Sequence, residues 1–467
     1  MRSSALPISL ALLLTGCSLA PAHVRPEPPV SAEYPSEFGA GPVGDTPATS
    51  TTWQELFADE RLELLIGTAL DNNRDMAIAV AQIEEARGFY RIQGAERFPT
   101  VGVSADAARI HSGTAATPGG SAGGGSVTYD RYSIGVGTSM FELDFWGRVR
   151  NLSEAARAQY LATVHGQQAL RLALIRQVSA TYLAVLETDE RIRLAEATVA
   201  SREEGLQIAG VRFEAGITSG LDYRQAESLL TQAEAQLAGL RLTRARLDNA
   251  MAVLVGRPLE GPLPEARPLD EQLEALALAP GLPSELLVNR PDILAAEEQL
   301  RAARANIGAA RAAFLPSISL TGSFGYASTE LSSLVGSDGM NWNFGPSVNL
   351  PIFDGGRRRG NLAAANAREE IALANYERAI QVAFREVADA LAGRRFLAEQ
   401  VAAQERGTQA QREIAELARI RYDEGAVGYI EVLDAERNLF AAEQALLQLQ
   451  RAEIENIVGL YVALGGL

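Results

Sequence analysis

The chain contains little of several residue types, and each shortage excludes a class of protein. Aromatic residues make up only 6% of the 467 residues, and lysine is absent, so all 42 basic residues are arginine. Few aromatics beside abundant Ala, Leu, Glu and Gln favour long helices over a sandwich core. Basic residues are outnumbered by 58 acidic ones. This balance argues against a nucleic-acid partner, because phosphate binding needs a basic face.

Residues for catalysis are also scarce. His23, His111 and His165 are scattered along the chain and lack metal-ligand spacing. No Ser/His/Asp or Cys/His arrangement can be assembled. The Gly135-x-Gly137 pair lies in a predicted strand, with no helix after it to hold a phosphate. We therefore expect no enzymatic activity, no metal and no cofactor.

The single cysteine, Cys17, excludes an intrachain disulfide framework. It follows Arg2, an apolar run over residues 8–14, and Thr15-Gly16. This order predicts a signal peptide over 1–16 that ends in a lipobox, with diacylglycerol on Cys17. The alternative is ordinary signal cleavage beside an incidental cysteine. Ser18 in place of an aspartate resembles bacterial lipoproteins that are sorted to the outer membrane. Residues 17–52, rich in Pro, Gly and Ser, are expected to form a lipidated N-terminal arm.

Long hydrophobic runs are absent beyond the signal peptide. We find no stretch of the roughly 18 apolar residues that a membrane-spanning helix needs. If the mature chain crosses a membrane, we expect it to do so as strands.

The chain repeats itself. Several residues of 53–257 recur 217 or 209 positions later in 284–467, among them Arg87 at Arg304, Gly147 at Gly356 and Gly216 at Gly425. Fixed offsets of this kind indicate a duplicated structural unit. The Pro-rich segment 258–283 is expected to be a linker or equatorial segment between the copies. The offset changes near a Gly/Ser-rich run, residues 117–126, which we interpret as a loop.

Each copy is expected to contain two strands between its helices. The predicted strands are about 100–112, 128–143, 317–327 and 341–352, because apolar and small polar residues alternate there. Alternation alone also fits a soluble hairpin. Their length, their uncharged polar face, and Tyr129, Tyr132 and Trp342 near the loop ends favour membrane strands. Four strands cannot close a barrel with a lumen, and lipid does not tolerate an open edge. Three protomers would supply twelve strands.

The helices are long and carry apolar heptad spacing. We predict shorter helices at 74–98 and 292–314, long proline-free helices at 151–214 and 360–423, and returning helices at 219–255 and 427–463. Each long helix would extend about 95 Å. Its length nearly equals the sum of the two shorter helices in its copy, so these are expected to lie end to end along it.

Several motifs resemble those of a known family. They are residues 281–293 with Arg290-Pro291-Asp292, the run Ala309 to Leu320, the Leu143–Arg148 segment and the Pro351–Arg357 segment. They resemble the outer-membrane efflux factors of the TolC and OprM type, and more closely the lipidated OprM/NodT branch. The resemblance implies an α+β membrane protein, as a homotrimer with a 12-stranded outer-membrane β-barrel continued by an α-helical coiled-coil barrel in the periplasm. It also implies a periplasmic adaptor and an inner-membrane transporter, commonly of the resistance-nodulation-division type.

The two helix-to-helix turns are candidate contact sites for the adaptor. Glycine there supplies left-handed backbone and Ser219 can cap the next helix, so plain hairpin chemistry explains these turns as well. The resemblance implies that the tips meet the adaptor. The candidate residues are Gly216, Ile217, Thr218, Ser219 and Gly220 in the first copy, and Gly425, Ala426, Val427 and Gly428 in the second.

Just beyond the second tip lies a candidate periplasmic gate. Ile430, Asp434 and Arg437 are spaced one helical turn apart, and the resemblance places Asp434 near the closed constriction. Threefold symmetry would make Asp434 a ring of carboxylates that favours cations, while Arg421 could pair with a neighbouring helix to hold the tip shut. A solvated helix face is the alternative.

The sequence thus predicts a passive outer-membrane exit duct for drugs or other small molecules. Two alternatives remain: a type I secretion duct for polypeptides, and a periplasmic coiled-coil lipoprotein that forms no channel.

Overall fold

The computed structural model of the chain describes residues 18–34, 46–47, 52–113, 126–258, 262–273, 278–279 and 283–466. The predicted signal peptide, Cys17, nearly all of the Gly/Ser-rich run and parts of the arm and linker lie outside these residues. The described chain divides into two compact units. Each is considered separately below.

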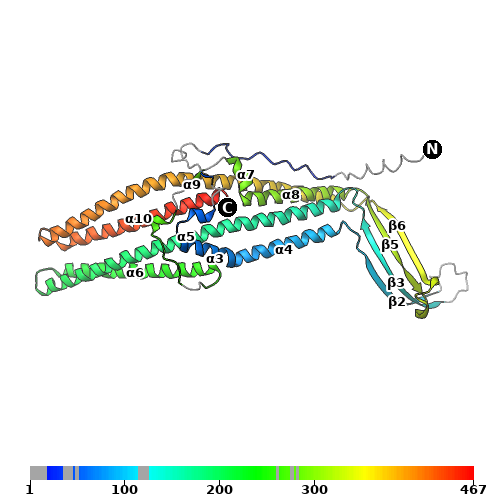
Figure 1. The fold of residues 1–467 in the computed structure, drawn as a ribbon, viewed down its shortest axis with the longest axis horizontal. Coiled ribbons are helices and arrows are strands. Elements are labelled where there is room, and N and C mark those ends of the chain that lie inside the picture. The colour runs from blue at the N-terminus through cyan, green and yellow to red at the C-terminus, as the bar shows by residue number, and fades with distance from the viewer. Residues whose placement is uncertain are drawn as a thin grey trace. The chain divides into compact units, whose positions relative to one another are not determined.

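The same order of elements occurs twice. The first copy contains α4 (Arg74–Ala95), β2 (Gly102–Ser112), β3 (Val127–Glu142), α5 (Arg148–Glu214) and α6 (Gly220–Val255). The second contains α8 (Pro291–Ala312), β5 (Ser317–Ser328), β6 (Met340–Asn349), α9 (Arg357–Asp423) and α10 (Tyr429–Ala463). The predicted α+β class and internal duplication are confirmed (Figure 1).

Both long helices begin three residues earlier than the sequence suggested. Asp144 accepts hydrogen bonds from the backbone N–H groups of Val149 and Arg150, at 3.0 and 2.7 Å. Asp354 accepts them from Gly356 and Arg358, at 3.1 and 3.2 Å. A carboxylate that satisfies the free N–H groups of a first turn lets the helix start there.

The first unit comprises Met1–Pro26, Ile83–Ala162 and Ala296–Asn375, and its centre is a four-stranded antiparallel sheet in the order β2-β3-β5-β6. A β-bulge interrupts the pairing of β3 with β5 between Thr138 and Phe141. Within the described residues, β2 and β6 each pair on one side only. The sheet therefore has two open edges.

The register gives this sheet one apolar and one polar face. Val136 pairs with Phe324, which pairs with Trp342, whereas Ser323 pairs with Asn343. All ten residues of β6 are exposed in the single chain.

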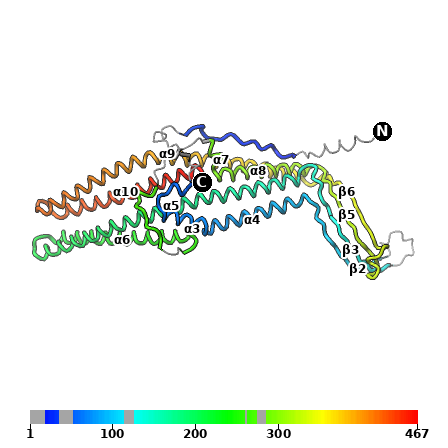
Figure 2. Tube along the Cα trace, viewed as in Figure 1, coloured from blue at the N-terminus to red at the C-terminus, as the bar shows by residue number. Residues whose placement is uncertain are grey.

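The second unit comprises Glu27–Gln82, Thr163–Ala295 and Tyr376–Leu467, and in it α9 and α10 form one hairpin (Figure 2). The unit also contains α2 (Trp53–Leu56), α3 (Glu60–Asn72), α7 (Leu286–Asn289) and the parallel strand pair β1 (Thr46–Pro47) with β4 (Leu278–Ala279). The second unit also contains two short 3-10 turns, η5 (Leu269–Glu271) and η6 (Pro283–Glu285). Two more, η7 (Leu331–Ser333) and η8 (Ser337–Gly339), belong to the first unit.

A buried carboxylate ties the linker to the helices of the second unit. Asp59 is fully buried and caps α3 through the backbone N–H of Arg61, at 2.8 Å. It also accepts hydrogen bonds from Tyr182 Oη at 2.7 Å and Gln272 Nε2 at 3.0 Å. Burial, together with the hydrogen bond to Asp59, raises the pKa of the Tyr182 hydroxyl. These contacts hold part of segment 258–283 against α5.

One helix departs from the expectation that no helix could span a membrane. By length and composition, α5 contains an 18-residue window apolar enough to do so. Half of that window is buried inside the chain, and a core helix passes the same test because its packed face is equally apolar.

Candidate functional site: the hairpin tips

The first candidate tip joins α5 to α6. Gly216 adopts a positive φ of 68°, and the backbone N–H of Ile217 donates to Arg212 O at 2.8 Å. Ser219 and Asp222 form a capping box at the start of α6. Hydrogen bonds from Thr218 and Ser219 lower the pKa of the Asp222 carboxyl. This tip is therefore fixed by its own side chains.

The second tip joins α9 to α10 with the same backbone but without that cap. Gly425 has a φ of 72°, and the N–H of Ala426 donates to Arg421 O at 2.9 Å. The N-cap is Gly428, which has no side chain to cap α10. Of the nine predicted tip residues, all are exposed except the partly buried Thr218 and Val427. The tips are thus available to a partner.

Three of the predicted gate residues, Ile430, Asp434 and Arg437, lie on the first turns of α10, whereas Arg421 lies in the last turn of α9, and the four do not form one group. Asp434 Oδ1 lies 3.2 Å from Arg437 Nη2. Arg421 instead forms an ion pair with Glu431, across its own hairpin. Ile430 is 45% exposed, and the side chains of Asp434 and Arg437 are more than half exposed. Sequence reasoning missed Glu431 as the partner of Arg421.

A packed layer that the sequence did not reveal lies behind these residues. Tyr422 and Val432 belong to a buried cluster at the tip, and the Tyr422 and Tyr429 rings lie 5.0 Å apart. The Arg212 guanidinium lies 5.1 Å from the centre of the Tyr422 ring, so it joins the two hairpins. A Cβ atom on Gly205 would come within 2.3 Å of Tyr429 Oη.

The same layer contains a buried cation. Arg202 of α5 is 4% exposed, and its Nη2 donates to Leu433 O of α10 at 3.2 Å. Its Nη1 has no hydrogen-bond partner within the described part of the chain. Burial lowers the pKa of Arg202, although the charge of nearby Glu436 opposes this. An incompletely satisfied buried charge is costly, and this cost offsets part of the stability that the hydrogen bond between α5 and α10 contributes.

A cavity of about 150 Å³ opens at the tips between the two hairpins. Arg212 and Asp222 line it from the first hairpin, and Tyr429 and Ile430 line it from the second. Sequence periodicity could not locate it, because its walls come from segments about 200 residues apart.

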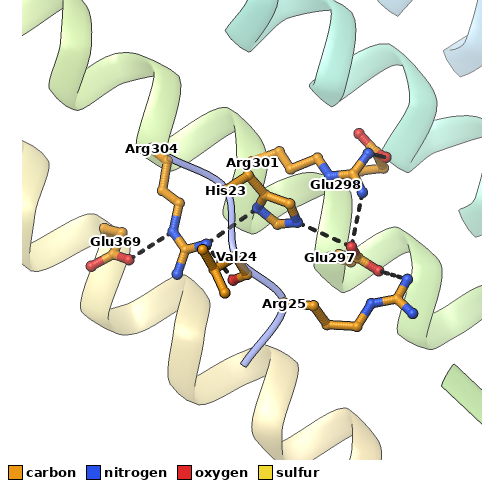
Figure 3. Close-up of polar contacts among 8 residues, drawn as sticks. All are labelled: His23, Val24, Arg25, Glu297, Glu298, Arg301, Arg304 and Glu369. Atoms are coloured by element: carbon orange, nitrogen blue, oxygen red, sulfur yellow. Dashed lines mark hydrogen bonds and ion pairs between the residues drawn. The ribbon is translucent and has the colours of Figure 1, made fainter. Parts of the chain in front are cut away.

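A second polar site fixes the N-terminal arm to α8 (Figure 3). Glu297, with a side chain 3% exposed, accepts hydrogen bonds from Arg25 at 2.7 Å and Arg301 at 2.9 Å, and lies 3.1 Å from His23 Nε2. Burial alone would raise the pKa of the Glu297 carboxyl, but the hydrogen bonds from Arg25 and His23 outweigh it and the pKa is lowered. Arg304 donates to Val24 O at 3.0 Å and to Glu369 at 3.0 Å.

The described residues contain no group of three or more His, Cys, Asp or Glu side chains able to hold a metal ion. His111 contacts Thr128 on the neighbouring strand, and His165 contacts Gln168 within α5. These histidines thus serve local contacts.

Comparison with known proteins places the whole chain in one group. A family model described as outer membrane efflux protein matches residues 65–257 and 282–466. The chain is 42% identical over 470 residues to the solvent efflux pump outer membrane protein SrpC of Pseudomonas putida, covering 100% of the chain and 98% of SrpC. It is 40% identical over 463 residues to the cation efflux system protein CusC of Escherichia coli, covering 99% and 98%.

A solved structure agrees in fold. The open-state MtrE outer membrane channel of Neisseria gonorrhoeae superposes with a TM-score of 0.86 at 38% identity. The match covers 96% of this chain and 98% of MtrE.

Proposed function

The chain belongs to the outer membrane efflux protein family, and we propose that it is a passive exit duct for small molecules delivered by a transporter of the resistance-nodulation-division type. It is the outer-membrane channel of a tripartite efflux system, with its helical part in the periplasm. It works as a homotrimer with a periplasmic adaptor and an inner-membrane transporter.

The open edges of the sheet are the observation that carries this proposal. Within the described residues, β2 and β6 are each paired on one side only. In lipid, every backbone polar group must be satisfied within protein, so these edges require strands from other chains. Pairing β6 of one protomer with β2 of the next, three times, closes a barrel of twelve strands.

The two faces of the sheet match the two surroundings of such a barrel. The face with Val136, Phe324 and Trp342 suits lipid, and the face with Ser323 and Asn343 suits a wet lumen. The described residues contain no group of three or more His, Cys, Asp or Glu side chains that could hold a metal ion. We propose that passage through the duct is passive.

The channel proposal is tested by purifying the full chain from outer membranes. We expect a trimer that dissociates on heating in detergent, and ion conductance when it is inserted in planar bilayers. A monomer that does not conduct would instead support a structural coiled-coil lipoprotein.

The small-molecule cargo is supported by the names of the relatives, which are a solvent efflux pump protein and a cation efflux protein. A strain that lacks its own outer-membrane channels should regain export of a fluorescent dye when this chain is expressed with its adaptor and transporter. Export of a polypeptide but not of the dye would favour the secretion alternative.

We further propose that the exposed tips contact the adaptor. Gly216 and Gly425 need positive φ, so a valine strains each turn. Gly216→Val and Gly425→Val should abolish cross-linking to the adaptor while the trimer persists. Gly407→Val, at an exposed position where a Cβ meets no atom within 4 Å, is the matched control. Undiminished cross-linking in the tip variants would count against the contact.

We also propose that Ile430, Asp434, Arg437 and Arg421 form the periplasmic gate. Threefold symmetry brings three copies of the Asp434–Arg437 pair to one level. Asp434→Asn should reduce the cation preference of single channels. Arg421→Gln should increase their open fraction, because it removes the Arg421–Glu431 ion pair of the second hairpin, which we propose helps to hold the tip closed. If both variants conduct with the same conductance and selectivity as the unmodified channel, these residues do not form the gate.

The lipid anchor at Cys17 completes the proposal. Its support is the lipobox order of residues 1–17 together with the ordered arm that follows. Mass spectrometry of the mature N-terminus should find Cys17 as the first residue, carrying diacylglycerol and an amide-linked acyl chain. A free thiol at Cys17 would contradict it.

A further inference from the structure

The two strand-to-helix junctions occupy equivalent positions in the duplicated chain but differ in charge. In the first, Arg148 Nη2 lies 2.7 Å from Glu142 Oε2. The offset of 209 places Arg357 at the position of Arg148, and Pro351 at the position of Glu142. The second junction thus lacks the neutralising carboxylate. The exposed Arg357 has no ion-pair partner within the described residues.

A second cation at the same turn is also uncompensated. Arg359 is exposed and forms no ion pair with any described residue. Arg358 between them is occupied, because it donates to Asp354 Oδ2 at 2.7 Å. The start of α9 therefore presents two guanidinium groups that form no ion pair with any described residue.

Uncovered apolar side chains precede these cations. Ile352 and Phe353 follow the end of β6 and are 93% and 89% exposed. At the first junction Phe145 and Trp146 are 44% and 38% exposed, and Trp146 Nε1 donates to Pro316 O at 2.8 Å. The apolar side chains of the second junction are thus about twice as exposed, and they lie beside arginines that form no ion pair with described residues. We call Ile352, Phe353, Arg357 and Arg359 the second-junction surface.

We propose that the second-junction surface binds acidic phospholipid headgroups in the periplasmic leaflet of the outer membrane. Apolar side chains insert at the level of the headgroups, and guanidinium groups bind phosphate through paired hydrogen bonds. The surface continues directly from β6, a strand of the membrane sheet. The N-terminal arm also indicates that the strand-to-helix junctions lie at the membrane surface. Ser18, the residue after the predicted lipid-bearing Cys17, donates to Asn151 in the first turn of α5 at 2.9 Å. The inference rests on the proposed channel.

The test uses the purified full-length trimer and native mass spectrometry with added phosphatidylglycerol or phosphatidylcholine. The unmodified trimer should prefer phosphatidylglycerol, and the preference should fall with added salt. The double variant R357Q/R359Q should lose about fivefold of this preference per arginine, roughly twenty-five-fold in all. Its control is R246Q/R257Q, which removes the same charge from exposed positions of the second unit and should keep the preference.

Two further outcomes keep the proposal falsifiable. I352S/F353S should weaken the binding of phosphatidylglycerol and phosphatidylcholine equally. The preference for phosphatidylglycerol should stay unchanged, because apolar side chains do not distinguish headgroups by charge. A conducting R357Q/R359Q trimer with unchanged preference overturns the inference but not the channel. Dissociation of that variant into monomers would also overturn it, since the arginines would then contact the next protomer. An unmodified chain that neither trimerises nor conducts would instead refute the channel.

Discussion

The two copies share their backbone but not their polar contacts, and the clearest contrast lies in their first helices. Arg87 of α4 hydrogen-bonds Tyr160 at 3.3 Å, and its counterpart Arg304 of α8 pairs with Glu369 at the position equivalent to Tyr160. Val80 in α4 is replaced by Glu297 in α8, on which the arm docks. Duplication therefore preserved the architecture, while single substitutions gave the second copy the arm contact.

The two hairpin tips likewise share their backbone but differ in their side-chain contacts. The first tip carries a side-chain cap from Ser219, and the second has Gly428 in that role. The second tip is instead held by the Arg421–Glu431 ion pair and the Tyr422–Tyr429 contact. Ion pairs at an exposed surface contribute little and yield to salt or to a partner. The second tip is therefore the one better suited to move.

The largest effect is expected from charged substitutions in the sheet, which test whether the strands of both copies have one face in contact with lipid. An arginine on the lipid face costs about 2–4 kcal/mol at mid-membrane depth, so Ala107→Arg in the middle of β2, on the same face as Val103, and Phe344→Arg in β6 should both prevent insertion of the trimer. Asn343→Arg, on the other face of β6, should insert and shift ion selectivity toward anions. Outer-membrane fractionation and bilayer recordings measure both. Normal insertion of either lipid-face variant would break the equivalence of the copies.

The next effect concerns the packing behind the tips. Gly205 lies against Tyr429, but its counterpart Ile414 is 48% exposed. Gly205→Ile should overpack this contact at a cost of about 1–3 kcal/mol and separate α10 from α5. We expect a higher open fraction in single-channel recordings. Gly407→Ile, at an open helical position, is the control; an equal effect there would show that the contact is immaterial.

A smaller effect tests the arm. Glu297→Gln removes the charge that Arg25 binds, which should cost about 1 kcal/mol because Arg25 is partly exposed. Residues 18–34 should then be cleaved faster by a protease. Glu298→Gln, next to it but paired among the described residues only with Arg301, should leave cleavage unchanged. Equal rates in both variants would show that the arm docks without this charge.

The pH dependence of the arm follows from the lowered pKa of Glu297. A depressed carboxyl pKa stabilises the docked arm at any pH above the ordinary glutamate value of about 4.3. This contribution is lost as the pH falls through the lower folded value. The protection of residues 18–34 against hydrogen exchange, taken relative to the intrinsic rate at each pH, should therefore persist at neutral pH and fall only in strong acid. Loss of protection already near neutral pH would contradict this account.

The smallest effect is expected when the N-cap residues of α6 and α10 are exchanged. Ser219→Ala should lose about 1 kcal/mol at the start of α6. Gly428→Ser should gain a few tenths of that energy at α10, because Gly428 already has extended backbone. Hydrogen exchange at the first turns of both helices measures the changes. Opposite shifts are expected, and parallel shifts would contradict the assigned caps.

Elements governed by local chemistry were predictable. Alternation in β5 and β6 indicated the two faces of the sheet, and Gly216 and Gly425 marked the turns. Contacts between distant segments were not predictable, because heptad spacing shows that a residue is packed but not against which helix. Arg202 with Leu433, and Gly205 with Tyr429, are separated by more than 200 residues. The docking of His23 and Arg25 on Glu297 also left no periodic signal.

The pairing of β6 with β2 of another protomer is the central claim, and disulfide cross-linking tests it most directly. One chain would carry Ser104→Cys in β2, and a co-expressed chain would carry a cysteine at Asn341, Asn343 or Ser347, on the same polar face of β6. We predict a covalent bond between chains at one register, and a chain with both cysteines should give dimers and trimers but nothing larger. Bonds within one chain, or no bond at any register, would contradict the trimeric barrel.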